Sequence, residues 1–428
     1  MNYTKTLLSV LSILISIHLM GQNEDNKVKV KFSGFIKSDI YHDSREVVAA
    51  RDGQFLLYPK NELFDDMGND INKVSNFNML SIQTRLKTVV TGPEVLGAMP
   101  TGVIEAAFLG NKNTDINSLR LRHAYINLNW TNSSLLVGQT WHTFMITECY
   151  PGTVSFNTGA PFMSALRNPQ IKYTHRFGSI SLVAAAMSQL DFTDAGPNPN
   201  NGEPESSSVF LRRAGIPELS IGVQYKKEFG ASNAFHAGAF LSYKQLLPRQ
   251  SITRNNTTIK LTEKVKATSF MVYAKAFTKP VTVKTQLTYG QALQSNLMLG
   301  GYGERVIFDP NNHSRPIGIQ YAPTNTLSYW LDAHTNGKTI QAGLFAGYTE
   351  NCGSDKELDT YYMRGYDIKY VYRVSPRVIY NVNKFRLSFE MEYTAAGYNN
   401  DVIDKRDRIN TTKEVGNIRF LGGVYYFF

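Results

Sequence analysis

The sequence predicts an all-β protein, a transmembrane antiparallel β-barrel of about sixteen strands with long external loops and short periplasmic turns. Three observations predict this fold. Apolar and polar residues alternate along short segments from end to end, the links between these segments are alternately short and long, and the last strand ends on an aromatic residue. An N-terminal export signal agrees with a location outside the cytoplasm.

Residues 1–21 predict a cleaved signal peptide. Lys5 gives a short positive region, Leu7 to Met20 form a nearly unbroken apolar run, and Gly21-Gln22 offers a small residue for cleavage. The run, roughly 14 residues, is short for a transmembrane helix of about 20. An uncleaved anchor is the alternative interpretation. We expect residues 22–428 to form a single outer-membrane barrel domain.

Composition excludes a helical membrane protein but not a barrel. After Gln22 no segment approaches 18 consecutive apolar residues. The mean hydropathy of -0.26 fits a soluble protein and a barrel equally well, because only alternate barrel residues face lipid. The net charge of +10 comes from scattered Lys and Arg rather than from runs. This argues against a nucleic-acid partner and favours a lumen that attracts anions.

The sequence offers little for other chemistry. Cys149 and Cys352 are too few for a disulfide scaffold, and either one disulfide or two free thiols would fit. Barrel enzymes need a His beside a Ser or an acid. Eight histidines occur, but no HExxH or GxSxG pattern does. We expect no enzymatic activity, no metal and no cofactor.

The segments with a period of two residues predict the strands. In Ser81–Lys87, for example, Ile82, Thr84 and Leu86 share one face, and the intervening polar residues share the other. The expected strands are 29–41, 76–89, 99–109, 117–130, 133–140, 168–177, 179–189, 217–229, 233–246, 264–277, 281–293, 325–334, 337–350, 366–382, 384–398 and 413–428.

Loop length separates a membrane barrel from a soluble β-sandwich. Even-numbered strands are followed by short links such as Thr131-Asn132 and Gly178, whereas odd-numbered strands are followed by longer loops, including 42–75, 141–167 and 294–324. Short turns at one end and long loops at the other are typical of outer-membrane barrels. The final strand, Ile418 to Phe428, is similar to the signal that the barrel-assembly machinery reads.

Energetics predicts which side chains line the lumen. A Lys or Arg on the lipid face near the midplane costs roughly 2–4 kcal/mol. The charged residues on alternating strands should therefore point inward, and Asp39, Glu105, Glu390 and Glu392 should form an acidic wall opposite the basic one. The expected lumen residues of the basic wall are Arg85, Lys87, Arg120, Arg122, Lys172 and Lys284.

Three segments resemble the DcaP-like porins. They are FSGFIKSD from Phe32 to Asp39, LRLRHAYINL from Leu119 to Leu128, and LVGQTWHTF from Leu136 to Phe144. The resemblance extends over about residues 32–190. It implies a trimeric porin, general or anion-preferring, with arginines at the constriction. By motif position these are Arg120 and Arg122 in the second segment and Arg85 in the related segment Thr84-Arg85-Leu86, with Arg167 as a further candidate.

The loop 141–167 is the candidate for narrowing the pore of such a channel. It contains Pro151, Gly152, Gly159 and Pro161, and in porin-like barrels the third external loop folds inward and narrows the pore. A surface loop is the competing interpretation. Some relatives carry a coiled coil before the barrel, whereas strand one here follows the cleavage site closely, so a homotrimer would be held by barrel walls.

The sequence thus predicts passive diffusion of small hydrophilic solutes, with a preference for anions such as organic acids. The expected partners are these solutes, outer-membrane lipid and lipopolysaccharide, the barrel-assembly machinery and two further copies of the chain. The alternative functions are an adhesive or structural barrel and a specific transporter of less polar substrates.

Overall fold

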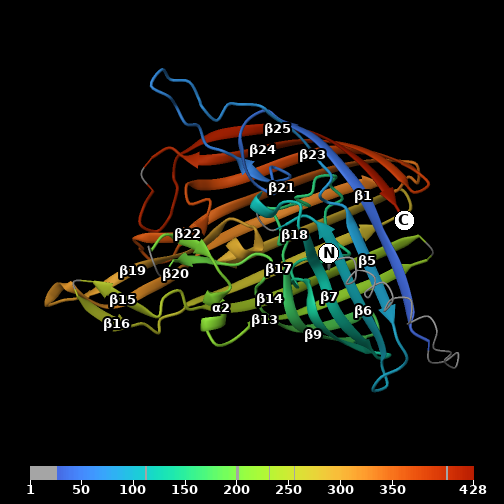
Figure 1. Ribbon diagram of the computed structural model, residues 1–428, viewed down its shortest axis with the longest axis horizontal. Helices are drawn as coiled ribbons and strands as arrows, with labels where there is room; N and C mark the ends of the chain where they lie inside the picture. The colour runs from blue at the N-terminus through green and yellow to red at the C-terminus, as the bar shows by residue number, and fades with distance from the viewer. Residues whose placement is uncertain (1–26, 111–112, 199–201, 231, 255, 402) are drawn as a thin grey trace, which may run out of the picture.

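The chain forms a closed β-barrel in which all paired strands are antiparallel (Figure 1). This computed structural model describes residues 27–428 apart from 111–112, 199–201, 231, 255 and 402, and the predicted signal peptide lies outside them. Strand β1 (Lys29–Asp43) closes the cylinder. It pairs with β25 (Thr412–Phe427) on one side and with β4 (Asn76–Leu80) and β5 (Arg85–Thr91) on the other. Closure of this kind satisfies the backbone groups that an open sheet edge would leave unpaired.

The described residues make a wall of sixteen strands, as the sequence predicts. β4 and β5 together form the second wall strand, which a turn at residues 81–84 interrupts. The other wall strands are β6 (Met99–Phe108), β7 (Leu119–Asn129), β8 (Ser133–Trp141), β9 (Arg167–Phe177), β10 (Ile180–Met187), β13 (Glu218–Phe229), β14 (Asn233–Leu246), β17 (Val265–Phe277), β18 (Val281–Gln291), β20 (Asn312–Thr335), β21 (Ile340–Ser354), β23 (Ile368–Val382) and β24 (Phe385–Asn399).

Several long loops contain structure that the sequence pattern did not indicate. Residues 42–75 hold a hairpin, and residues 294–324 hold β19 and the first half of β20, so the strand predicted over 325–334 is longer than expected. β20 extends past the barrel rim because β19 supplies its backbone partners there. The loop elements are β2 (Val47–Ala50), β3 (Phe55–Pro59), β11 (Ala195–Pro197), β12 (Pro204–Ser206), β15 (Ser251–Arg254), β16 (Thr257–Lys260), β19 (Gly300–Asp309), β22 (Thr360–Arg364), α2 (Val209–Arg213), η2 (Asn113–Asp115) and η3 (Leu293–Asn296).

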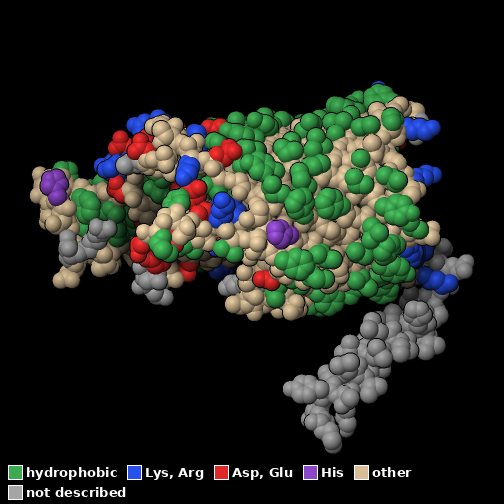
Figure 2. Space-filling view, turned by 90° about the horizontal axis from the view of Figure 1, so that it is seen from above, with side chains coloured by type: hydrophobic (Ala, Val, Ile, Leu, Met, Phe, Trp, Pro, Cys, Tyr) green, Lys and Arg blue, Asp and Glu red, His purple; other side chains and the backbone are tan. Residues whose placement is uncertain are grey.

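The outer face of the wall is apolar. Figure 2 shows hydrophobic side chains spread over the visible part of the wall, with charged side chains gathered where the long loops begin. Tyrosines stack side by side near that boundary, with ring centroids of Tyr329 and Tyr348 5.4 Å apart and those of Tyr348 and Tyr370 6.0 Å apart. An apolar band bordered by aromatic residues is the surface that a barrel presents to lipid. No helix in the described ranges is long and apolar enough to cross a membrane.

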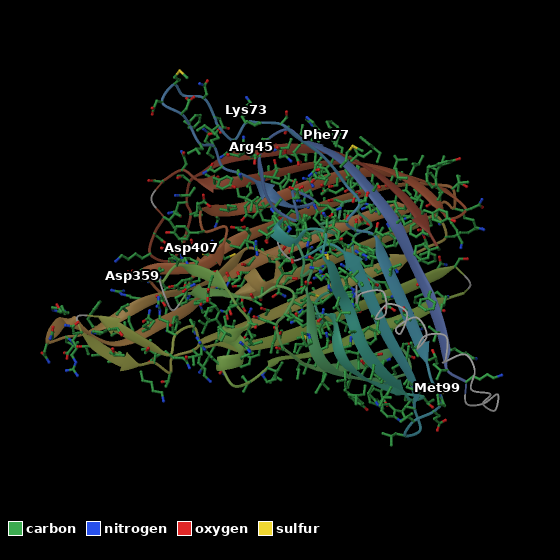
Figure 3. The ribbon with its side chains drawn as sticks, in the orientation of Figure 1. Arg45, Lys73, Phe77, Met99, Asp359 and Asp407 are labelled. Atoms are coloured by element: carbon green, nitrogen blue, oxygen red, sulfur yellow. The ribbon has the colours of Figure 1, made fainter. Side chains whose placement is uncertain are left out.

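The two ends of the barrel differ. The short turns lie at one end with the C-terminus, and the long loops extend from the other (Figure 1). Figure 3 places Asp359 and Asp407 at the long-loop end and Met99 at the short-turn end. A separate apolar cluster supports the protruding loops, and it includes Phe210, Tyr302 and Ile319.

Candidate pore constriction

Seven of the charged residues predicted from the sequence to line the lumen all point into the barrel. Each of the wall strands β5, β6, β7 and β9 presents an exposed apolar residue next to a charged one, and Leu86, Ile104, Leu121 and Ile171 are 46–56% exposed. The side chains at alternate positions face inward because successive residues of a strand point to opposite faces. The inward residues are Arg85 and Lys87 on β5, Glu105 on β6, Arg120 and Arg122 on β7, and Arg167 and Lys172 on β9.

The four arginines among these residues form a cluster of guanidinium groups on one wall. They are Arg85, Arg120, Arg122 and Arg167. Glu105 accepts a hydrogen bond from Nε of Arg122 at 2.8 Å and lies 3.9 Å from Nη1 of Arg85. Asp191, from the loop after β10, pairs with Arg120 at 3.0 Å and also with Arg167.

The indole ring of Trp141 lies between two members of this cluster. The ring centroid is 4.6 Å from the guanidinium of Arg167 and 5.7 Å from that of Arg122. Because a guanidinium stacks favourably on an aromatic face, the ring helps to hold both side chains in place.

A fifth arginine reaches the cluster from the first long loop. β2 and β3 fold into the lumen as a hairpin whose turn, Arg51-Asp52-Gly53, has positive φ angles of 59°, 53° and 82°. Arg51 is only 1% exposed, and its guanidinium lies 5.2–5.7 Å from the rings of Phe55, Phe156 and Phe192. It interacts electrostatically with Arg120, Arg167 and Asp191. A bulky side chain at positive φ is uncommon and is found where the surroundings hold it in place.

Inward-facing side chains of the distant wall hold this hairpin. Arg373 donates from Nη2 to the carbonyl oxygens of Leu56 and Leu57, both at 3.2 Å. Arg419 donates to the carbonyl oxygen of Gly53 at 2.8 Å. Tyr398 donates its hydroxyl to the carbonyl oxygen of Pro59 at 2.5 Å. The polar backbone of the hairpin is thus satisfied inside the barrel.

The loop 141–167 contacts the same distant wall. The backbone N–H groups of Val154 and Ser155 donate to Glu390 at 2.8 and 3.1 Å. Asn157 donates to Glu392 at 3.0 Å, and the N–H of Gly152 donates to Asp332 at 3.2 Å. Both loops therefore cover the lumen side of β20 and β23–β25.

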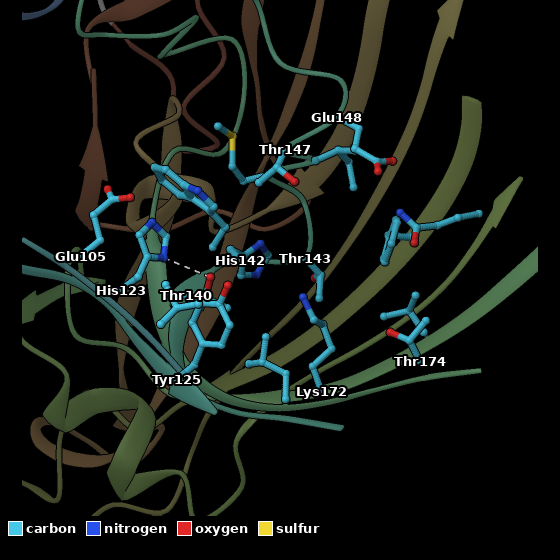
Figure 4. A pocket seen from close by; sticks show the side chains of 18 of the residues that line it. Glu105, His123, Tyr125, Thr140, His142, Thr143, Thr147, Glu148, Lys172 and Thr174 are labelled. Atoms are coloured by element: carbon cyan, nitrogen blue, oxygen red, sulfur yellow. Dashed lines mark hydrogen bonds between the residues drawn. The ribbon is translucent and has the colours of Figure 1, made fainter. Parts of the chain in front are cut away.

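The opposite side of the lumen retains a cavity of about 500 Å³ (Figure 4). It lies between the start of the loop 141–167 and the wall from β5 to β14. Lys87, Glu105 and Lys172 line this cavity, whereas Arg85, Arg120, Arg122 and Arg167 do not. His123 lines it too, with Nδ1 3.1 Å from the hydroxyl of Thr140. A second cavity, of about 360 Å³, shares Lys172 with the first.

Asp191 is an ionised carboxylate within the arginine cluster. Burial alone would raise the pKa of Asp191, but the adjoining guanidinium groups of Arg167 and Arg120 lower that pKa below its usual value. The carboxylate therefore stays ionised and neutralises part of the cluster.

Cys149 and Cys352 are both free, the first buried and the second exposed.

Arg51 and Asp191 were not among the residues predicted from the sequence. A signal for Arg51 existed, because Asp52-Gly53 between the apolar runs 47–50 and 55–58 is a typical hairpin turn. Asp191 lies in a predicted loop, and nothing in its neighbours indicates that it reaches Arg120 and Arg167.

Comparison with known proteins gives a family match over part of the chain and a similar fold over most of it. Residues 22–202 match the family described as DcaP outer membrane protein, which confirms the resemblance found in the sequence. No curated protein matches the chain. The structure is similar to the outer membrane channel DcaP of Acinetobacter baumannii, with a TM-score of 0.64 and 16% identity over 95% of this chain and 99% of that one.

Two further solved structures share the fold. In vitro folded OmpT, an outer membrane protein of Vibrio cholerae, gives a TM-score of 0.52 and 13% identity over 96% of this chain and 100% of that one. The anion-selective porin from Comamonas acidovorans gives a TM-score of 0.50 and 10% identity over 94% of this chain and 100% of that one. At these identities the likeness establishes the barrel fold alone.

Proposed function

We propose, from the match of residues 22–202 to the DcaP outer membrane protein family, that this outer-membrane channel lets small hydrophilic solutes diffuse passively and favours anions such as organic acids. The location in the outer membrane and the channel class follow from the family and the fold. The preference for anions is our inference from the charges inside the barrel.

The excess of positive charge at the constriction carries this proposal. Five guanidinium groups meet there, and three carboxylates compensate them, counting Asp115, which interacts electrostatically with Arg120. An excess of two positive charges in a confined space of low dielectric raises the local concentration of anions. The arginines concerned are Arg51, Arg85, Arg120, Arg122 and Arg167, and the other two carboxylates are Glu105 and Asp191.

We place the solute path along the wall from β5 to β17. The hairpin β2–β3 and the loop 141–167 fill the other side, and we propose that together they constrict the pore. Below the arginine cluster, Lys87 and Lys172 line the cavity, so an anion would meet positive side chains at two levels. Glu148 lines both cavities and Glu105 lines the first, so the path also contains two acidic groups.

Planar bilayer recordings test this function. We expect single-channel conductance, and a reversal potential under a KCl gradient whose sign shows that anions are favoured. Arg120→Glu should weaken that preference, whereas Lys279→Glu, in the exposed turn between β17 and β18, should not. A selectivity that is unchanged by Arg120→Glu would remove Arg120 from the site.

The alternative functions give other results in the same assay. An adhesive or structural barrel would show no conductance, and this outcome would overturn the porin proposal. A transporter of less polar substrates would conduct ions poorly but would pass apolar solutes into liposomes. The homotrimer that the family resemblance implies can be tested by measuring the mass of the protein in detergent by light scattering.

A further inference from the structure

The outer surface of the barrel has a basic groove just above the apolar band. The groove has a volume of about 590 Å³. The tops of β14 and β17 form its floor, β20 its upper side, and residues 262–264 and Lys356 its ends. It lies outside the barrel, away from the solute path proposed above.

Two neighbouring wall residues fix the height of the groove. Gln245 on β14 pairs with Lys266 on β17, and Leu241 pairs with Phe270 four residues further down both strands. Leu241 and Phe270 are each 43% exposed and belong to the lipid-facing surface. At a rise of about 3.3 Å per residue, Lys266 lies about 13 Å along the strand from that apolar pair. Its ammonium group therefore reaches the level at which lipid headgroups begin.

Both groove residues on these strands face outward. Lys266 is exposed and lies between the buried residues Val265 and Ala267. Gln245 lies between Lys244 and Leu246, which are both buried. Since the buried neighbours point into the barrel, the polar side chains of Gln245 and Lys266 point away from it.

The groove carries more positive than negative charge. Lys264, Lys266 and Lys356 line it, and among its lining residues Glu263 is the one carboxylate. Lys264 donates to the carbonyl oxygen of Ala214 at 2.6 Å, which holds its ammonium group in place without neutralising it. Within the described part of the chain, no carboxylate forms an ion pair with any of these three lysines, whereas Lys369 and Lys405 at the same end do have acidic partners.

We propose that this groove binds the phosphorylated headgroup of an outer-leaflet glycolipid, lipopolysaccharide. Lysines bind phosphate as compact positive charges, and the apolar wall below them fits the acyl chains of the same molecule. A lipid matches both features, whereas a soluble anion would match the lysines alone. The proposal rests on the outer-membrane location of the chain and not on conduction through it.

Lipid titration of the full-length barrel in neutral detergent tests the site. The probe is bisphosphorylated lipid A, and the bound molecules are counted by native mass spectrometry. Replacing Lys264, Lys266 and Lys356 together by Gln should weaken binding roughly 100-fold, since each basic residue near an anionic surface contributes about fivefold. Replacing them by Arg should preserve binding.

A matched variant controls for net charge. Lys279, Lys338 and Lys384 are exposed in the short turns at the opposite end, and their replacement by Gln removes the same charge. This variant should bind lipid A as the wild type does. Single-channel conductance should be normal in both triple variants, which separates a failure of the lipid site from a failure of the porin proposal.

Three results would overturn the proposal. One is equal lipid binding by the wild type and the groove variant, with both barrels folded as shown by their migration before and after heating. Another is equal binding of dephosphorylated lipid A, which would make the contact apolar. The last is displacement of the lipid by inorganic phosphate at millimolar concentration, which would assign the lysines to a soluble anion.

Discussion

Replacing Glu390 by Ala should release the loop 141–167 from the wall and change the current through the channel. Glu390 lies on β24, is fully buried, and accepts the backbone N–H groups of Val154 and Ser155 at 2.8 and 3.1 Å. Lys37 also donates to the carbonyl oxygen of Val154 at 2.9 Å, but Glu390 holds two consecutive N–H groups, so its carboxyl group acts as the main anchor of this part of the loop. Val154 is 4% exposed, and its N–H group has little access to water while the loop is docked.

The magnitude follows from these two hydrogen bonds. A buried donor that loses its partner costs about 1–3 kcal/mol, so two such donors cost roughly 2–6 kcal/mol before the loop relaxes. Water can partly hydrate the two released N–H groups, so we take about 3 kcal/mol as the loss of docking free energy. Because 1.4 kcal/mol corresponds to a factor of ten, the undocked fraction of the loop should rise by about a hundredfold.

Single-channel recording measures this change directly. The variant should show added current fluctuations or a larger conductance, because an undocked loop would no longer provide the constriction that we propose. Glu414→Ala is the matched control, since Glu414 lies on the neighbouring strand β25 and accepts hydrogen bonds from Tyr370 and Tyr372 away from the lumen. Currents identical to those of the wild type in Glu390→Ala would refute the assignment of an anchor.

Two further predictions concern the loops. Arg51→Gln should lower the anion-to-cation permeability ratio about tenfold, because a unit charge about 6 Å from an ion favours an anion by about 0.7 kcal/mol and disfavours a cation by as much, even at the dielectric constant of water; Arg51→Lys should retain the ratio. Burial raises the pKa of Asp407 to about 7 in the folded loop 400–411. The Asp407 carboxyl group therefore stays protonated in the folded loop up to about pH 7, whereas in the unfolded loop it ionises near pH 4. Because the folded loop binds the proton more tightly, the docking of this loop weakens as the pH rises to about 7. Proteolysis of the loop should be faster at pH 8 than at pH 5, and Asp407→Asn should remove the difference.

The wall of this barrel could be predicted from the sequence because lipid imposes the pattern. A position such as Leu86 must be apolar and its neighbour Arg85 must face the lumen, since the opposite register would put charge into hydrocarbon. Each predicted wall strand therefore matches an observed one, and the lengths of the links reveal which end carries the loops. These are local properties that a single sequence contains.

The arrangement inside the lumen could not be predicted in this way. Arg51 reaches the constriction because Arg373 and Arg419, more than 300 residues away, hold the backbone of its hairpin. The alternation of apolar and polar residues along a strand does not indicate a contact between segments so far apart in the sequence. The extension of β20 was missed for a related reason: above the rim its partner is β19, not a lipid-facing wall strand, so the apolar alternation that marks a wall strand is not required there.

The contacts of the wall that the two inserted loops cover also change the prediction of opposed acidic and basic walls in the lumen. The sequence suggested an acidic wall opposite the basic one, formed by Asp39, Glu105, Glu390 and Glu392, yet Glu105 pairs with Arg122 on the basic wall and the other three residues are at most 1% exposed. Asp39 pairs with Lys37 at 2.9 Å and accepts a hydrogen bond from Gln54 of the inserted hairpin at 2.8 Å. Asp39 and Glu392 are each matched by a cation, Lys37 and Arg373, whereas the arginine cluster keeps an excess of positive charge, so that excess should set the selectivity. Asp39→Asn is therefore expected to leave the reversal potential unchanged in barrels that fold normally, and a shift toward stronger anion preference would show that the acidic wall does act on the permeating ion.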